Sequence, residues 1–86
     1  MGRYRVFIKP SAVREIEAVP QKRQRQRIVA RIEALSDDPR SAGCEKLSGR
    51  EQYRVRQRVY RIVYAIEDDQ LVVHVVKVGH RSSVYR

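Results

Sequence analysis

The sequence is short of several residue types, and each shortage excludes a class of protein. Its 86 residues include no tryptophan, one phenylalanine and one cysteine. A lone Cys44 cannot form an internal disulfide, which excludes the small disulfide-stapled secreted domains and fits a reducing compartment. Cys44 also follows a loop-like segment with no histidine nearby in the sequence, so it is a poor nucleophile. Because no cysteines and histidines have metal-ligand spacing, we expect neither a metal nor another cofactor.

Long apolar runs are missing as well. The longest contain about five residues, whereas a transmembrane helix needs roughly 20. Residues 1–5 include two arginines and lack the apolar centre of a signal peptide. Apolar residues nevertheless make up 42% of the chain, enough for a packed core. We therefore expect a cytoplasmic protein with no membrane partner, folded as a single domain over residues 1–86.

Acidic residues are few compared with basic ones. Ten Asp and Glu stand against nineteen Lys and Arg, which gives a formal net charge of +9. Fifteen of the nineteen cations are arginines, and the planar guanidinium suits contacts with phosphates and bases. A generally basic surface, or one that binds an acidic protein, is the alternative. The clustering of the arginines favours a nucleic acid.

The N-terminal half of the sequence predicts one strand followed by two helices. Residues 3–9 alternate weakly between polar and apolar side chains, as a strand does. Ser11 is a suitable N-cap for a helix over 12–19, and Pro20 ends that helix and suits the first turn of the next. The second helix, over 21–36, has an apolar stripe for packing. Its members are Ile28, Ile32 and Leu35.

The C-terminal half predicts three strands. Residues 53–57 and 60–66 alternate between two faces, and 67–70 form a turn. Residues 71–78 are nearly all β-branched, which is typical of a central strand covered on both faces, and a polar tail follows over 80–86. The order β-α-α-β-β-β predicts an α+β fold. Its twisted, mostly antiparallel sheet would carry the N-terminal helical hairpin on one face.

The predicted hairpin separates an apolar face from a face that carries arginines. Arg54 and Arg56 point the same way on a strand, about 6.6–6.8 Å apart, which is close to the spacing of phosphates in an extended nucleic-acid backbone. The returning strand brings Arg61 beside them. These arginines repel one another unless an anion binds. They could instead be only the solvated side of a half-buried sheet, but no acid interrupts the sequence between Gln52 and Ile66, which favours binding.

The segment after the last strand carries a second group of reactive side chains. His80 titrates near neutrality, and Arg81 supplies charge for a pentacoordinate phosphate. Tyr85 supplies a hydroxyl or a ring on which a base can stack. An unstructured tail is the alternative. His74, which lies among valines, is interpreted as a core or edge histidine, and the charged run 22–27 as the solvated face of a helix.

These segments together resemble the RelE branch of the RelE/ParE toxin superfamily. The matching stretches are residues 46–49, 53–56, 60–64, 78–81 and 84–85. The resemblance implies a toxin of a type II toxin–antitoxin system that enters the ribosomal A site and cuts messenger RNA there. The attacking group would be the messenger's own 2′-hydroxyl, with no metal. The implied partners are the messenger RNA, the ribosome with its 16S rRNA, and a RelB-like antitoxin.

Several members of this family have lysines at the positions of Arg54 and Arg56, and a lysine there is assigned as the general base. Arginine is effectively never deprotonated, so we expect these two residues to bind phosphate while His80 supplies acid or base. The resulting catalytic set is Arg61, His80, Arg81 and Tyr85. The RNA- and phosphate-binding set is Arg54, Arg56, Lys46 and Lys77.

Two other functions remain open at this point. The ParE-like branch has the same fold and inhibits DNA gyrase without catalysis, although its members generally lack this basic and His/Tyr set. A basic RNA-binding module would use charge alone and would make no new RNA ends.

Overall fold

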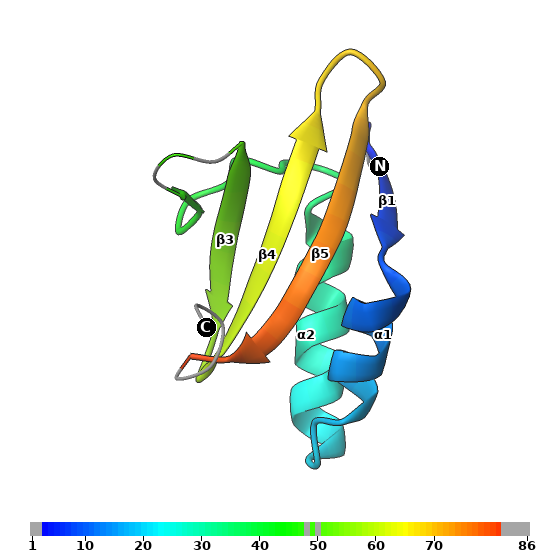
Figure 1. Cartoon of the computed structure of the whole chain (residues 1–86), viewed down its shortest axis with the longest axis vertical. Helices are drawn as coiled ribbons and strands as arrows, with labels where there is room; N and C mark the ends of the chain where they lie inside the picture. The colour runs from blue at the N-terminus through cyan, green and yellow to red at the C-terminus, as the bar shows by residue number, and fades with distance from the viewer. Residues whose placement is uncertain (1–2, 48, 50, 82–86) are drawn as a thin grey trace.

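The computed structural model describes residues 3–47, 49 and 51–81 (Figure 1). Its elements are β1 (Arg5–Ile8), α1 (Pro10–Glu17), α2 (Lys22–Ala34), β2 (Glu45–Lys46), β3 (Gln52–Gln57), β4 (Tyr60–Glu67) and β5 (Val72–His80). The sheet has the order β1-β5-β4-β3-β2, with β1 parallel to β5 and the other neighbours antiparallel. The expected α+β class is confirmed, and the short β2 is a strand that the predicted order lacked.

Both helices cover the same face of the sheet, and within residues 3–47, 49 and 51–81 no helix covers the other face (Figure 1). The predicted stripe of α2 is confirmed, because Ile28, Ile32 and Leu35 are all at most 1% exposed. The sheet side of this core is built from alternate residues of β3, β4 and β5. These residues are Val55, Ile62, Tyr64, Val73, Val75 and Val78.

The helices begin at different residues from those predicted. Helix α1 starts at Pro10 with Lys9 as its N-cap, so Ser11 is not the cap. Proline suits the first helical position, because its fixed φ is already helical and its missing N–H would have no partner there. Pro20 lies in the turn between the helices, and α2 begins only at Lys22. Of these two prolines, Pro10 therefore occupies the first turn of a helix, whereas Pro20 precedes α2.

The side chain of Arg25 stabilises the turn between the two helices. The Arg25 guanidinium donates to the carbonyl oxygens of Val19, at 2.6 Å, and of Pro20, at 3.2 Å. These carbonyls follow the end of α1, where backbone acceptors lack helical partners. This arginine of the predicted charge run is therefore tied to the fold, while Lys22 and Arg23 are exposed as expected.

Strand β5 is central, as predicted, but the helices cover only one of its faces. Val63 pairs with Lys77 while Tyr64 pairs with Val75, so β5 contains one extra residue, Val76, at a bulge. The bulge shifts the alternation, which is why Val75 and Val78 both face the helices. His74 belongs to the uncovered face and is half-exposed, so it is neither a core nor an edge-strand histidine.

A polar network joins the loop after α2 to the turn between β4 and β5. The Arg40 guanidinium forms a two-bond ion pair with Asp68, at 2.8 and 2.9 Å, and Tyr4 Oη donates to the same carboxylate at 2.9 Å. These donors, Arg40 first, lower the pKa of Asp68 to about 2. Nearby, buried Tyr64 donates to the carbonyl oxygen of Pro39 at 2.5 Å. The two contacts hold the loop against the end of the sheet.

Candidate nucleic-acid interface

Arginines gather on the sheet face that the helices leave open. Arg56 and Arg61 are direct cross-strand partners on β3 and β4, and Arg54 lies one row away opposite Val63. The neighbouring Val55 and Ile62 are fully buried on the helix side, so alternation sends these three arginines to the other side. We call the surface formed by Arg54, Arg56, Arg61 and the adjacent Arg81 the arginine face.

The charges of this face are close enough to act on one another. Partial burial lowers the pKa of Arg61, and the positive charges of Arg54, Arg56 and Arg81 lower it further. Arg81, the residue after β5, lies near the hairpin. Its backbone N–H donates to Val59 O at 2.7 Å, which ties the end of β5 to the β3–β4 turn. The face therefore has a high positive potential suited to a polyanion.

Glu45 adds one carboxylate to the arginine face. Strand β2 pairs with β3 so that Glu45 lies opposite Arg54, whose Nη2 donates to Glu45 Oε2 at 2.5 Å. The Arg54 side chain is 15% exposed and that of Glu45 is 56% exposed, so the carboxylate remains within reach of solvent. Arg54 is the main cause of a lowered pKa at Glu45, and Arg56 and Arg61 contribute.

Sequence reasoning missed Glu45 because a two-residue strand has no periodicity to detect. The absence of acids between Gln52 and Ile66 predicts a basic face without a carboxylate. The structure adds one, because Glu45 belongs to the adjacent strand β2. Its sequence signal was weak: a glutamate a few residues before a predicted hairpin.

His80 lies on the opposite side of the sheet from the arginines. It pairs with Tyr60, and their rings are 6.0 Å apart in an edge-on arrangement. Alternation from the buried pair Ile62 and Val78 places both rings on the helix side. There His80 borders a shallow hollow with residues of the interhelical turn and α2. The other residues of that hollow are Pro20, Gln21, Gln24, Arg58, Val59 and Tyr60.

The expected grouping of His80 with Arg81 is therefore not what the structure shows. Consecutive residues at the end of a strand point to opposite faces, so only one of the two can join the arginines. Arg81 is the one that does. Tyr85, the last residue of the expected catalytic set, lies outside the described residues.

The two lysines expected to bind phosphate are engaged elsewhere. Lys46 pairs with Tyr53, which lies on the helix side, and its Nζ is 3.6 Å from Glu51. Lys77 Nζ is 3.0 Å from Glu15 of α1, and the same carboxylate accepts the N–H of Val78 at 2.9 Å. Lys77 thus helps join α1 to β5. Its pairing with Val63 places it on the same side of the sheet as the arginines, whereas Lys46 lies on the helix side.

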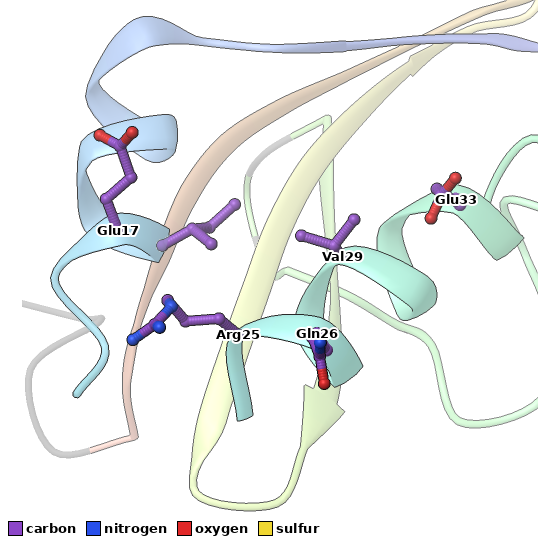
Figure 2. A pocket seen from close by; sticks show the side chains of 6 residues that line it. Glu17, Arg25, Gln26, Val29 and Glu33 are labelled. Carbon is purple, nitrogen blue, oxygen red and sulfur yellow. The ribbon is translucent and has the colours of Figure 1, made fainter. Parts of the chain in front are cut away.

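A second hollow lies between the two helices (Figure 2). Glu17 borders it from α1, and Arg25, Val29 and Glu33 border it from α2, where acidic and basic groups are mixed. It lies in the helical layer, on the other side of the sheet from the arginine face. Mixed charge gives it no preference for a polyanion, so the arginine face is the better candidate for a nucleic acid.

Two features are absent from residues 3–47, 49 and 51–81. No helix there is long and apolar enough to span a membrane. Within the same residues, no three His, Cys, Asp or Glu side chains group as ligands for a metal ion.

Known proteins share this architecture. A family model described as the ParE toxin of the type II toxin-antitoxin system, parDE, matches residues 6–85. A chain of the archaeal RelE-RelB complex from Pyrococcus horikoshii is 25% identical, with a TM-score of 0.82 over 95% of this chain and 99% of that one. The isolated RelE toxin of Escherichia coli is 29% identical, with a TM-score of 0.77 over 95% and 90%. A chain of the RelBE2 toxin-antitoxin complex of Mycobacterium tuberculosis is 26% identical. Its TM-score is 0.70, over 92% of this chain and 99% of that one. No curated protein sequence matches significantly.

These matches place the fold among toxins of type II toxin–antitoxin systems. The chain belongs to the ParE toxin family, within the RelE/ParE superfamily, and is itself a toxin of this kind. The resemblance drawn from the sequence is thereby confirmed at the level of the superfamily.

Proposed function

We propose that this toxin is a metal-independent endoribonuclease that cuts messenger RNA in the ribosomal A site. The observation that carries the proposal is the arginine face, where four arginines gather on the side of the sheet opposite the helices. Their combined positive charge suits a polyanion. RNA supplies both the anion and the nucleophile, since its 2′-hydroxyl can attack the adjacent phosphate.

In this mechanism, the 2′-oxygen forms a bond to phosphorus while the bond to the 5′-oxygen of the next nucleotide breaks. The products are a 2′,3′-cyclic phosphate and a 5′-hydroxyl. Arg61 and Arg81 stabilise the additional negative charge of the pentacoordinate phosphate, because their guanidinium charges lie close enough to act on one another. Arg54 and Arg56 hold the flanking phosphates. A base must take the proton of the 2′-hydroxyl, and solvent water protonates the departing 5′-oxygen.

Glu45 is the group that we assign as the base. Its carboxylate lies on the arginine face, is more than half exposed and has a lowered pKa, so it is ionised at neutral pH. Arginine cannot take this role. His80, expected from the sequence to supply acid or base, lies on the other side of the sheet, away from the arginines. Tyr85 keeps the role that the resemblance implies, orienting the 2′-hydroxyl or stacking on a base.

The proposal includes a RelB-like antitoxin as partner. Solved relatives from Pyrococcus horikoshii and Mycobacterium tuberculosis are toxin–antitoxin complexes of the RelE–RelB kind. A toxin with a net charge of +9 and an open arginine face offers an acidic partner a large electrostatic gain. Such a partner would cover the arginine face and block RNA from it.

The test combines purified toxin with ribosomes programmed with a defined messenger, followed by mapping of new 5′-ends. Wild type should produce cuts within the translated frame, and Arg61→Ala should abolish them. Arg23→Ala is the matched control, because Arg23 is an exposed arginine of α2 in the other layer. Cuts that persist in Arg61→Ala, or that vanish equally in Arg23→Ala, would contradict the proposal.

Gyrase inhibition without catalysis is the second candidate, and the match to the ParE family model favours it. It predicts arrested growth with intact messenger RNA. A DNA supercoiling assay with purified gyrase separates the two functions: inhibition there, without messenger cleavage, supports the second candidate and overturns the first.

A further inference from the structure

A second cluster of planar groups lies on the open face of the sheet, on β1 and β5. The rings of Phe7 and His74 are stacked, with centroids 6.0 Å apart and an interplanar angle of 25°. The guanidinium carbon of Arg5 lies 5.8 Å from the centre of the Phe7 ring. Phe7 is 50% exposed and the His74 side chain 43%, so the cluster is open to solvent.

The pairing register puts this cluster on the same side of the sheet as the arginine face. Phe7 pairs with His74, and His74 pairs with Ala65 of β4. Ala65 lies four residues after Arg61 on β4, so the two share a face and are separated by about 13 Å along the strand. An RNA strand whose phosphates lie on the arginine face reaches that row of residues within a few nucleotides.

The chemistry of the cluster suits a base and not another phosphate. Glu67 Oε1 lies 3.3 Å from His74 Nε2, so a carboxylate stands beside the rings and repels an anion. The same contact holds the imidazole in place beside Phe7. Aromatic and guanidinium planes are the surfaces on which unpaired bases stack, and the contact tolerates any base because every base has a π-face.

A single exposed phenylalanine would by itself be unremarkable, since large apolar side chains often reach the surface. Three features of Phe7 go further: its near-parallel partner, the guanidinium over its ring, and its place on one continuous face with four arginines. By contrast, Val13 and Val29 are exposed to a similar degree on the helices, on the other side of the sheet, where no such features accompany them.

We propose that Phe7 and His74 form a stacking subsite for one unpaired base of the RNA whose phosphates bind the arginine face. The inference rests on the proposed function and deepens it, because it assigns the direction in which the RNA runs across the sheet. The strand passes from Arg61 and Arg81, over β4 and β5, toward the edge strand β1. Arg5 stands beside the base, where its guanidinium plane offers a further stacking surface.

The experiment measures the affinity of the purified chain for a short fluorescein-labelled single-stranded RNA by anisotropy. Phe7→Leu should weaken binding by roughly 5-fold or more, the loss expected for one stacked base, while Phe7→Trp should bind at least as tightly. Val29→Ala is the matched control, an exposed apolar residue of α2, and should bind like wild type. Thermal unfolding of each variant by circular dichroism shows whether it is folded.

Abasic probes locate the stacked base. For wild type, an abasic nucleotide at one position of the RNA should lower the affinity. For Phe7→Leu, the same abasic nucleotide should leave the affinity unchanged. Because the chain contains no tryptophan, Phe7→Trp also introduces a single reporter whose fluorescence RNA should quench. Equal losses at that position in both proteins, or no quenching, would overturn the subsite.

The outcomes separate this inference from the function on which it rests. If Arg61→Ala weakens RNA binding and Phe7→Leu does not, the stacking subsite fails and the arginine face stands. If neither variant changes RNA binding, the proposed function fails with it. If Phe7→Leu weakens binding of an antitoxin and leaves RNA binding unchanged, the cluster is a protein contact and the subsite is overturned.

Discussion

Arg56 and Arg61 face each other directly across the β3–β4 hairpin. The two positive charges repel each other, and an anion bound across the pair would relieve this repulsion. Burial lowers the pKa of Arg61, and the positive charges of Arg54, Arg56 and Arg81 lower it further. The arrangement gives this part of the sheet a positive potential that suits a polyanion.

Arg61→Ala should weaken RNA binding. Removing one phosphate contact should reduce the slope of log affinity against log salt concentration by about 0.7 for a single strand. Thermal unfolding followed by circular dichroism checks that the variant is folded. Anisotropy titrations at several salt concentrations check the slope; an unchanged slope would mean that Arg61 does not contact phosphate.

Glu45→Gln tests the assigned base. The amide keeps an oxygen that can accept from Arg54 but cannot take up a proton, so cleavage should fall by roughly 10²- to 10⁴-fold while RNA binding stays intact or tightens. Glu51→Gln is the control, an exposed glutamate paired with Lys46. Full cleavage by Glu45→Gln would remove this residue from the mechanism.

The lowered pKa of Glu45 also predicts the pH dependence of wild-type cleavage. A base must be ionised to act, and this carboxylate stays ionised down to a pH below its ordinary value of 4.5. The rate should therefore show no acid limb between pH 5 and 7 and should fall only as the pH drops through the lowered pKa. A limb centred near pH 6.5 would indicate a histidine instead.

His80→Ala should change cleavage by less than 10-fold and leave its pH profile unaltered. The reason is positional: the imidazole packs edge-on against Tyr60 on the helix side of the sheet. Single-turnover cleavage across a range of pH measures this. A large loss together with a shifted profile would restore His80 as acid or base, and would require the ribosome to rearrange the end of β5.

Asp68 should make the fold sensitive to acid. Its pKa is about 2 in the folded protein against 3.8 for the ordinary group, so the carboxylate stabilises the fold above pH 3.8. This contribution is lost as the pH falls toward 2, because the proton then binds in both states. Urea unfolding midpoints of wild type and Asp68→Asn should differ at pH 5 and converge near pH 2. Asp69→Asn, the neighbouring exposed carboxylate, is the control and should follow wild type throughout.

Tyr64→Phe should destabilise the protein by about 1–3 kcal/mol, the cost of leaving a buried polar group without its partner. The Tyr64 hydroxyl donates to Pro39 O inside the core, and burial raises the pKa of this tyrosine. Urea denaturation at neutral pH measures the change. Stability equal to wild type would show that water replaces the hydroxyl at this carbonyl.

Local patterns in the sequence were enough to predict much of this fold. Alternation separated Arg54 and Arg56 from Val55, because successive side chains of any strand point to opposite faces. The stripe of Ile28, Ile32 and Leu35 followed from the helical repeat in the same way. These features depend only on residues a few positions apart, so no knowledge of the partner elements was needed.

The composition of the functional surface was decided by tertiary structure. Which face His80 occupies depends on its pairing with Tyr60, and the place of Glu45 depends on a two-residue strand with no signal of its own. Phe7 and His74 meet because β1 pairs in parallel with β5, a contact between the two ends of the described chain. The sequence by itself determined the strands, the helices and which residues alternate within them. Only the long-range pairing of strands decided which of these residues share a surface, because the register between distant segments is set by the packing of the whole core.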